Sequence, residues 1–120
     1  MLFRSGIMNY KIDNSDLNNI KIVALSNIES NTTVGEWVTL EPQSDESRYL
    51  YQKENMTEPW HESDDLGRYA NHSNNPNTRV ELVDNSIKMI SNKIIVEGEE
   101  IFVDYNTLTE LIGYIPHTDF

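Results

Sequence analysis

Apolar and polar residues alternate in short runs along much of the chain, a pattern typical of β-strands rather than long helices. Residues 8–12 and 20–25 alternate in this way, and the turn-forming sequence DNSDLNN lies between them. A polar turn at 29–32 precedes a further run at 34–40. The first third of the chain is therefore predicted to form three short strands.

The second half of the chain continues this pattern. Residues 78–83 and 86–90 alternate and are separated by an Asp-Asn pair, which is a hairpin signal. Near the end, Ile101 and Val103 share one face of a further predicted strand. Many short strands joined by frequent turns predict a mainly β fold.

Helices are predicted to be few and short. Residues 41–67 are the least regular part of the chain, and within them residues 48–53 form a plausible short helix behind a capping serine. A second short helix is predicted from the capping-box spacing at 107–110, with Gly113 as its stop.

The size and charge of the chain limit the functions that it can have. At 120 residues, the chain fits one domain spanning 1–120. Its net charge of −11 argues against direct nucleic-acid binding, because affinity for that backbone comes mainly from Lys and Arg. An acidic surface favours a basic partner, although the charge can equally serve solubility. Without cysteine, the chain has neither a disulfide framework nor a thiolate zinc cluster.

No targeting or metal-binding segment is predicted. The apolar run at the start is too short for a secretion signal, and no later stretch approaches a membrane span. We therefore expect a cytoplasmic protein without a membrane partner. His61, Glu62, Asp64, Asp65 and His72 are metal-ligating residue types, but surface acidic runs are usually only solvated. We predict no metal site.

Two stretches carry the candidate chemistry. Residues 68–77 read RYANHSNNPN, which is rich in amide side chains, poor in aliphatic ones and stiffened by a proline. Residues 98–105 read GEEIFVDY, a turn that runs into a strand. At the end of that strand, the ring of Tyr105 is supported and its hydroxyl is free to reach a ligand.

Together, these stretches resemble the paired signature of SET-domain protein lysine methyltransferases, R-F-x-N-H-S-x-x-P-N followed by G-E-E-L/I-x-x-D-Y. A weaker likeness to the family's opening motif lies at 23–28, followed by Val34. The resemblance covers residues 8–105 and is closest to short, stand-alone viral SET proteins. Residues 41–67 then correspond to a variable insert and 106–120 to a C-terminal tail.

The resemblance implies a fold and an activity. The fold is the SET-domain (β-clip-like) fold, made of small twisted sheets with short helices and a knot-like threading near the C-terminus. The implied activity is methyl transfer from S-adenosyl-L-methionine to a lysine of a basic protein or peptide. The viral relatives further suggest a homodimer that acts in a host cell.

The resemblance also assigns site residues. Tyr105 is the implied catalytic residue. The implied cofactor-binding residues are Asn19, Lys21, Ile22, Arg68, Tyr69, Asn71, His72 and Tyr105. The implied substrate-binding residues are Tyr49, Trp60, Val103 and Tyr114. Aromatics such as Tyr49 and Trp60 are, however, more often ordinary core residues, and a small residue such as Val103 leaves room for higher methylation.

One departure from the family concerns Asn19 and Lys21, which stand where the family has the glycines of a G-x-G turn. Asn19 tolerates a left-handed backbone and is expected to keep the turn, whereas Lys21 places a side chain where backbone would approach the cofactor. Two alternatives therefore stay open. One is a catalytically degenerate SET fold that binds a protein partner, and the other is an acidic mimic of nucleic acid that blocks a basic protein.

Overall fold

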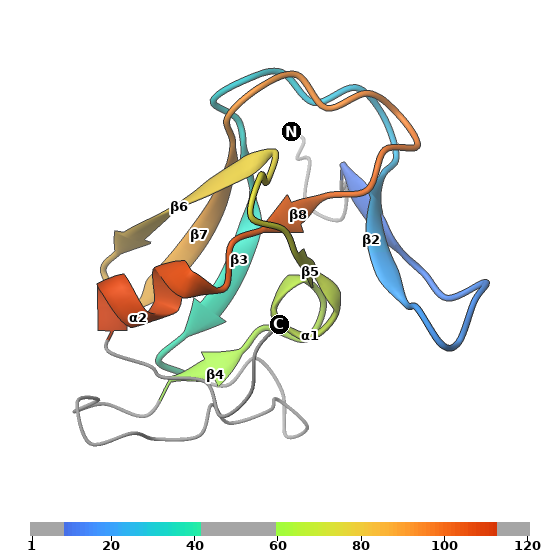
Figure 1. The fold of residues 1–120 in the computed structure, drawn as a ribbon. Coiled ribbons are helices and arrows are strands. Elements are labelled where there is room, and N and C mark those ends of the chain that lie inside the picture. The colour runs from blue at the N-terminus through green and yellow to red at the C-terminus, as the bar shows by residue number, and fades with distance from the viewer. Residues whose placement is uncertain (1–8, 42–59, 113–120) are drawn as a thin grey trace, which may run out of the picture.

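The computed structural model describes residues 9–41 and 60–112, and within these ranges the protein is mainly β with two short helices (Figure 1). In chain order the elements are β1 Tyr10–Asp13, β2 Lys21–Ala24, β3 Thr33–Thr39, β4 His61–Glu62, α1 Leu66–Tyr69, β5 Asn71–His72, β6 Thr78–Val83, β7 Ser86–Ser91, β8 Phe102–Val103 and α2 Asn106–Ile112. The predicted helix at 48–53 lies outside the described residues, as do Tyr49 and Tyr114.

Strands β1 and β2 form the antiparallel hairpin that the sequence predicts, with Tyr10 opposite Ala24 and Asp13 opposite Lys21. Its connecting turn is closed by local hydrogen bonds. The Asp16 side chain accepts the amide of Asn18 at 3.0 Å, and the Asp16 carbonyl accepts the amide of Asn19 at 2.9 Å.

Asn19 keeps the turn, as the sequence predicts, but it does so without a left-handed backbone. Among the non-glycine residues that the structure describes, only Asn31 (φ 64°) and Asp84 (φ 54°) have a positive φ. The turn before β2 closes through the side chain of Asp16 instead, so it needs neither a glycine nor a left-handed asparagine.

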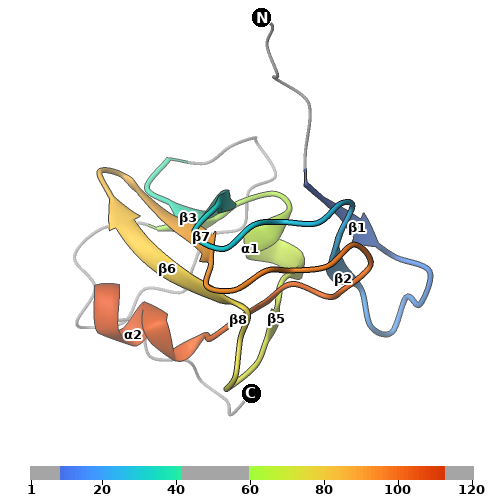
Figure 2. The ribbon, with the colours of Figure 1, turned by 90° about the horizontal axis from the view of Figure 1, so that it is seen from above.

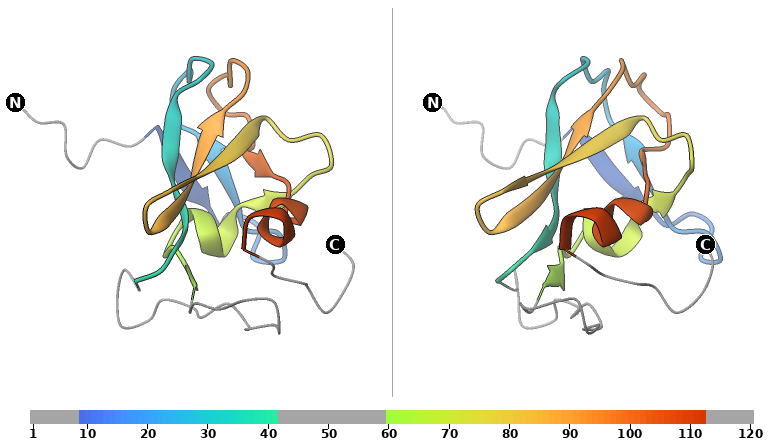
Figure 3. Two further views of the ribbon diagram at one scale, coloured as in Figure 1. Left: turned by 90° about the vertical axis from the view of Figure 1, so that its left-hand side faces the viewer. Right: turned by 60° about the vertical axis from the view of Figure 1, so that its left-hand side comes forward.

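The largest sheet has four strands in the order β4-β3-β7-β6. The predicted pair at 78–83 and 86–90 is confirmed as the β6–β7 hairpin, with the left-handed Asp84 in its turn. Figure 3 shows how strongly this sheet twists from β3 to β6. Such twist is the normal consequence of strand geometry in a small sheet.

An irregularity in β3 decides which of its side chains enter the core. Glu36 pairs with Lys88 and Val38 pairs with Ile87, so Trp37 is an extra residue without a partner. Such a bulge re-aims neighbouring side chains. Trp37 and Val38 are both buried, at 2% and 1% exposed, whereas Glu36 is only half-buried.

A third sheet consists of the two-residue strands β5 and β8, which run parallel and pair Asn71 with Phe102 and His72 with Val103. Two predictions need correction here. Residues 68–77 are not one irregular loop, because they contain the end of α1 and all of β5. The last predicted strand is shorter than expected. The knot-like threading stays a prediction.

Packing around β8 follows the predicted alternation, since Ile101 and Val103 are fully buried while Phe102 is partly exposed. The connections after β2 and after β7 lie at the top of the molecule in Figure 1, run side by side in Figure 2 and are joined by the Ile28–Ile95 bridge. The short helix predicted near 107–110 is confirmed as α2. Neither helix in the described ranges has the length and apolar content to cross a membrane.

Candidate active site

The two motifs meet in space, although a hairpin and a long connection separate them in the chain. Strand β5 comes from the first motif and β8 from the second. Beyond the strands, the amide of Ser73 donates to the carbonyl of Val103 at 3.0 Å. We call this meeting of residues 70–78 and 100–105 the motif junction (Figure 2).

Asn77 and Thr78 fix the backbone of the second motif. The side-chain amide of Asn77 donates to the carbonyl of Glu100 at 2.9 Å, and its oxygen accepts the amide of Phe102 at 2.9 Å. The hydroxyl of Thr78 donates to the carbonyl of Phe102 at 2.6 Å. The end of one motif therefore holds the other in register.

Asn71 ties the junction to the β1–β2 hairpin. Its amide nitrogen donates to the carboxylate of Glu100 at 2.8 Å and lies 3.4 Å from the carbonyl of Ile20. The neighbouring Ile22 is fully buried, and its carbonyl accepts the amide of Ile101 at 2.8 Å. The structure thus brings together three of the predicted segments, and the Asn71 side chain works as a brace between them.

The ring of His72 supports Tyr105. Its Nδ1 accepts the backbone amide of Tyr105 at 3.0 Å, and its Nε2 lies 3.0 Å from the side-chain oxygen of Asn74. Because an acceptor at Nδ1 and a donor at Nε2 satisfy both contacts, the network assigns the neutral tautomer with the proton on Nε2. The two rings lie 5.1 Å apart between centroids. His72 is therefore placed to position the end of β8.

Tyr105 is half-buried, and its hydroxyl donates to the carbonyl of Ala70 at 2.7 Å. The expectation that this hydroxyl is free is wrong, because the closing turn of α1 brings the Ala70 carbonyl beside it. The oxygen of the hydroxyl still carries lone pairs. Burial raises the pKa of the Tyr105 phenol, and the carboxylates of Glu62 and Glu100 raise it further. The phenol is thus neutral at ordinary pH.

Trp37 was missed by sequence reasoning as a site residue. Its ring stacks on that of Tyr105, with centroids 6.3 Å apart and planes at 26°. Only its position in a predicted strand was visible in the sequence. The bulge in β3 that turns its ring toward Tyr105 depends on pairing with β7.

Arg68 and Tyr69 lie on α1, just before the junction. Arg68 is exposed, and its guanidinium lies 5.9 Å from the centroid of the half-buried Tyr69 ring. On the hairpin, Asn19 is exposed and Lys21 is half-buried at the start of β2. These positions border the segments that the motif junction joins.

The predicted substrate residues divide into two groups. Trp60 is 6% exposed and belongs to the core cluster, which agrees with the alternative that it is a core aromatic. Val103 is fully buried beneath the junction. Tyr49 and Tyr114 lie outside the described residues. In the described ranges, no group of three or more His, Asp or Glu side chains is arranged to hold a metal ion.

Comparisons with known proteins agree with this geometry. A family model of the SET domain matches residues 19–106. The methyltransferase domain of human PR domain-containing protein 2 has a TM-score of 0.56 and 18% identity, over 83% of this chain and 78% of that chain. A Plasmodium falciparum protein described as a candidate histone methyltransferase has a TM-score of 0.55 and 21% identity, over 82% of this chain and 94% of that chain. At these identities, the two structures show a shared fold. A search of curated proteins gave no significant match.

Proposed function

Because the chain belongs to the SET-domain family, we propose that it is an S-adenosyl-L-methionine-dependent protein lysine N-methyltransferase that acts on a basic protein segment. One observation carries the proposal. The hydroxyl of Tyr105 is held 2.7 Å from the carbonyl oxygen of Ala70, so two oxygen atoms converge where the motifs meet. The acidic charge of the chain suits a basic substrate.

The chemistry of these residues fits the proposed cofactor. Bound S-adenosyl-L-methionine supplies a methyl group on a positively charged sulfur, already activated for transfer to an amine. Oxygen atoms such as those of Tyr105 and Ala70 favour a methyl group of this kind through weak C–H···O contacts. Arg68 and Lys21 provide positive charge for a carboxylate at the border of the junction. The backbone at Asn71 and His72 completes the proposed binding set.

The chain's own residues then have distinct roles. Tyr105 contacts the reacting groups, so it is the proposed catalytic residue. His72 and Trp37 act through Tyr105, because they hold its backbone amide and the face of its ring. Asn77 fixes the strand that carries Tyr105. Much of the expected rate advantage of such a site comes from holding the partners in line.

Proton balance sets the expected pH dependence. The target lysine must lose its proton before it can attack, and its usual pKa is about 10.4. The raised pKa of Tyr105 keeps the phenol neutral over the pH range in which the lysine ammonium loses its proton. We therefore expect the rate to rise by about tenfold per pH unit between pH ~7 and ~9, without a falling limb in that range.

A transfer assay tests the proposal. The protein is incubated with S-adenosyl-L-methionine labelled on its methyl group and with basic protein substrates, and transfer to lysine is located by mass spectrometry. In parallel, calorimetry measures the binding of S-adenosyl-L-methionine to the protein in the absence of substrate. No transfer at any pH up to about 9, together with no cofactor binding, would contradict the proposal.

A second candidate is a SET fold that binds a protein partner without catalysis. The departure from the family's glycines at Asn19 and Lys21 favours it, because a lysine side chain takes the place of backbone. The calorimetry separates the two candidates, since tight cofactor binding is expected only for the enzyme. The homodimer suggested by the sequence remains a separate prediction, to be tested by light scattering.

A further inference from the structure

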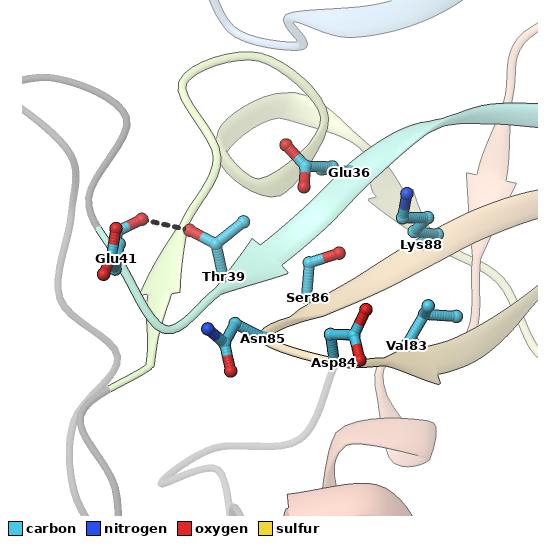
Figure 4. Close-up of a pocket in the computed structure, with 8 residues that line it drawn as sticks. All are labelled: Glu36, Thr39, Glu41, Val83, Asp84, Asn85, Ser86 and Lys88. Carbon is cyan, nitrogen blue, oxygen red and sulfur yellow. Dashed lines mark hydrogen bonds between the residues drawn. The ribbon is translucent and has the colours of Figure 1, made fainter.

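A polar pocket lies away from the motif junction, on the four-stranded sheet. It has a volume of about 390 Å³. Its lining residues, which we call the sheet pocket, are Glu36, Thr39, Glu41, Val83, Asp84, Asn85, Ser86 and Lys88. They come from β3, β7, the end of β6 and the adjoining turns, and none belongs to either motif (Figure 4).

The bulge in β3 separates the pocket from the active site. Trp37 is buried and stacks on Tyr105, whereas its neighbour Glu36 lines the pocket. Val38 and Ile87 are likewise core residues that do not line it. The same strand therefore presents one face to the candidate catalytic tyrosine and the other to the pocket.

Ser86 indicates that the pocket is built for a ligand. The residue is 6% exposed, and its side-chain hydroxyl opens into the pocket and makes no hydrogen bond in the described part of the chain. Figure 4 shows this hydroxyl pointing into the space between Glu36, Asp84 and Lys88. A hydroxyl can both donate and accept, so this group offers a ligand in the pocket a hydrogen bond that no protein group in the described ranges takes. Thr39, by contrast, donates to the carbonyl of Glu41 at 2.5 Å.

The charges of the lining decide which ligand fits. Three carboxylates, those of Glu36, Glu41 and Asp84, outweigh the single ammonium of Lys88. In the described ranges, no group of acidic and histidine side chains is arranged to hold a metal ion. The excess of carboxylates favours a cation, and the Ser86 hydroxyl favours one that also carries hydrogen-bond donors. An organic cation such as a guanidinium or an ammonium group can engage a carboxylate and a hydroxyl together.

We propose that the sheet pocket is a secondary binding site for a cationic side chain, arginine or lysine, of the basic protein substrate. Its description as a substrate site rests on the proposed methyltransferase function. Because the pocket and Tyr105 lie on opposite faces of β3, the pocket binds a part of the substrate other than the target lysine. It adds affinity and selects substrates with a second basic residue.

Direct binding tests the proposal without any methyl transfer. Fluorescein-labelled peptides of alternating arginine and glycine, or lysine and glycine, are titrated into the full-length protein without S-adenosyl-L-methionine. A glutamine-glycine peptide serves as the uncharged control. Fluorescence anisotropy gives the affinities, and comparison of the two basic peptides shows which cation the pocket prefers.

Substitutions in the pocket give the discriminating result. We expect the double variant Glu41→Gln/Asp84→Asn to bind the preferred peptide about threefold to tenfold more weakly. Lys88→Gln should bind it about threefold more tightly, because a repelling charge is removed. Matched changes of net charge at exposed positions outside the pocket, the double variant Glu29→Gln/Glu97→Gln and the single variant Lys93→Gln, should alter affinity by less than about twofold.

The outcomes are distinct. Equal shifts in pocket and control variants would mean that only the net charge attracts the peptide, and unchanged affinity in the pocket variants would show that the pocket is not a site. Either result overturns the inference. If the pocket dependence holds but no methyl transfer is found, the pocket stands as a cation site and the proposed function fails. In an active enzyme, Glu41→Gln/Asp84→Asn should raise KM and Lys88→Gln should lower it, and both should leave kcat unchanged.

Discussion

The motif junction and the sheet pocket lie on opposite faces of β3, yet they satisfy their polar groups in different ways. At the junction, the side chains of Asn71, His72 and Asn77 are all hydrogen-bonded within the protein. In the pocket, the hydroxyl of Ser86 has no partner among the described residues. A pre-arranged centre suits chemistry that demands fixed geometry, whereas an open, charged surface suits recognition.

The largest expected effect is on the stability of the junction. Asn77→Ala removes the partners of the Phe102 amide and the Glu100 carbonyl together. We expect the free energy of unfolding to fall by about 3 kcal/mol, because each unmade buried bond costs about 1–3 kcal/mol. Urea denaturation measures the change. Asn75→Ala, in the same loop but exposed, is the control and should change stability by less than about 0.5 kcal/mol.

Loss of the Tyr105 hydroxyl, the proposed catalytic group, comes next. Tyr105→Phe should lower kcat by about 100-fold, a barrier increase of about 2.7 kcal/mol, while the stacking on Trp37 is kept. The control is Tyr10→Phe, which removes the phenol hydroxyl of a buried tyrosine, one that donates to Asp65 at 2.6 Å. That control should affect unfolding more than kcat. Equal losses of kcat in the two variants would argue against a catalytic role for Tyr105.

A smaller effect is expected from the positioning histidine. His72→Ala should lower kcat by about tenfold, because the Tyr105 amide loses its acceptor. His72→Asn keeps a side-chain acceptor near the position of Nδ1 and should recover part of the loss. Steady-state kinetics with both variants check this. If neither variant differs from the original chain, His72 does not position Tyr105.

The smallest expected effect on stability is in the pocket. Ser86→Ala removes a hydroxyl that opens into the pocket and has no partner among the described residues, so the free energy of unfolding should change by less than about 0.5 kcal/mol. The same variant should bind the basic peptide more weakly. A clear loss of stability would show that the hydroxyl serves the fold rather than a ligand, and would remove the contrast between the two regions.

Local patterns in the sequence determined local structure. Alternation and turn residues predicted the β1–β2 and β6–β7 hairpins, and capping residues predicted α2. The alternation that buries Ile101 and Val103 was likewise correct. Each of these features is set by residues close together in the chain, for which spacing and backbone preference are sufficient. The resemblance of two motifs to one family added the expectation that distant segments share a site.

The tertiary structure decided how those segments touch. The parallel pairing of β5 with β8, the hold of Asn77 on the second motif and the stacking of Trp37 on Tyr105 all join residues far apart in the chain. The hydrogen bond from the Tyr105 hydroxyl to the Ala70 carbonyl also joins distant residues, and the sequence had predicted a free hydroxyl there. Such contacts depend on how the whole chain closes on itself, and residue spacing does not encode them. For the same reason, the pocket lined by Ser86 became visible only when β3, β6 and β7 were placed side by side.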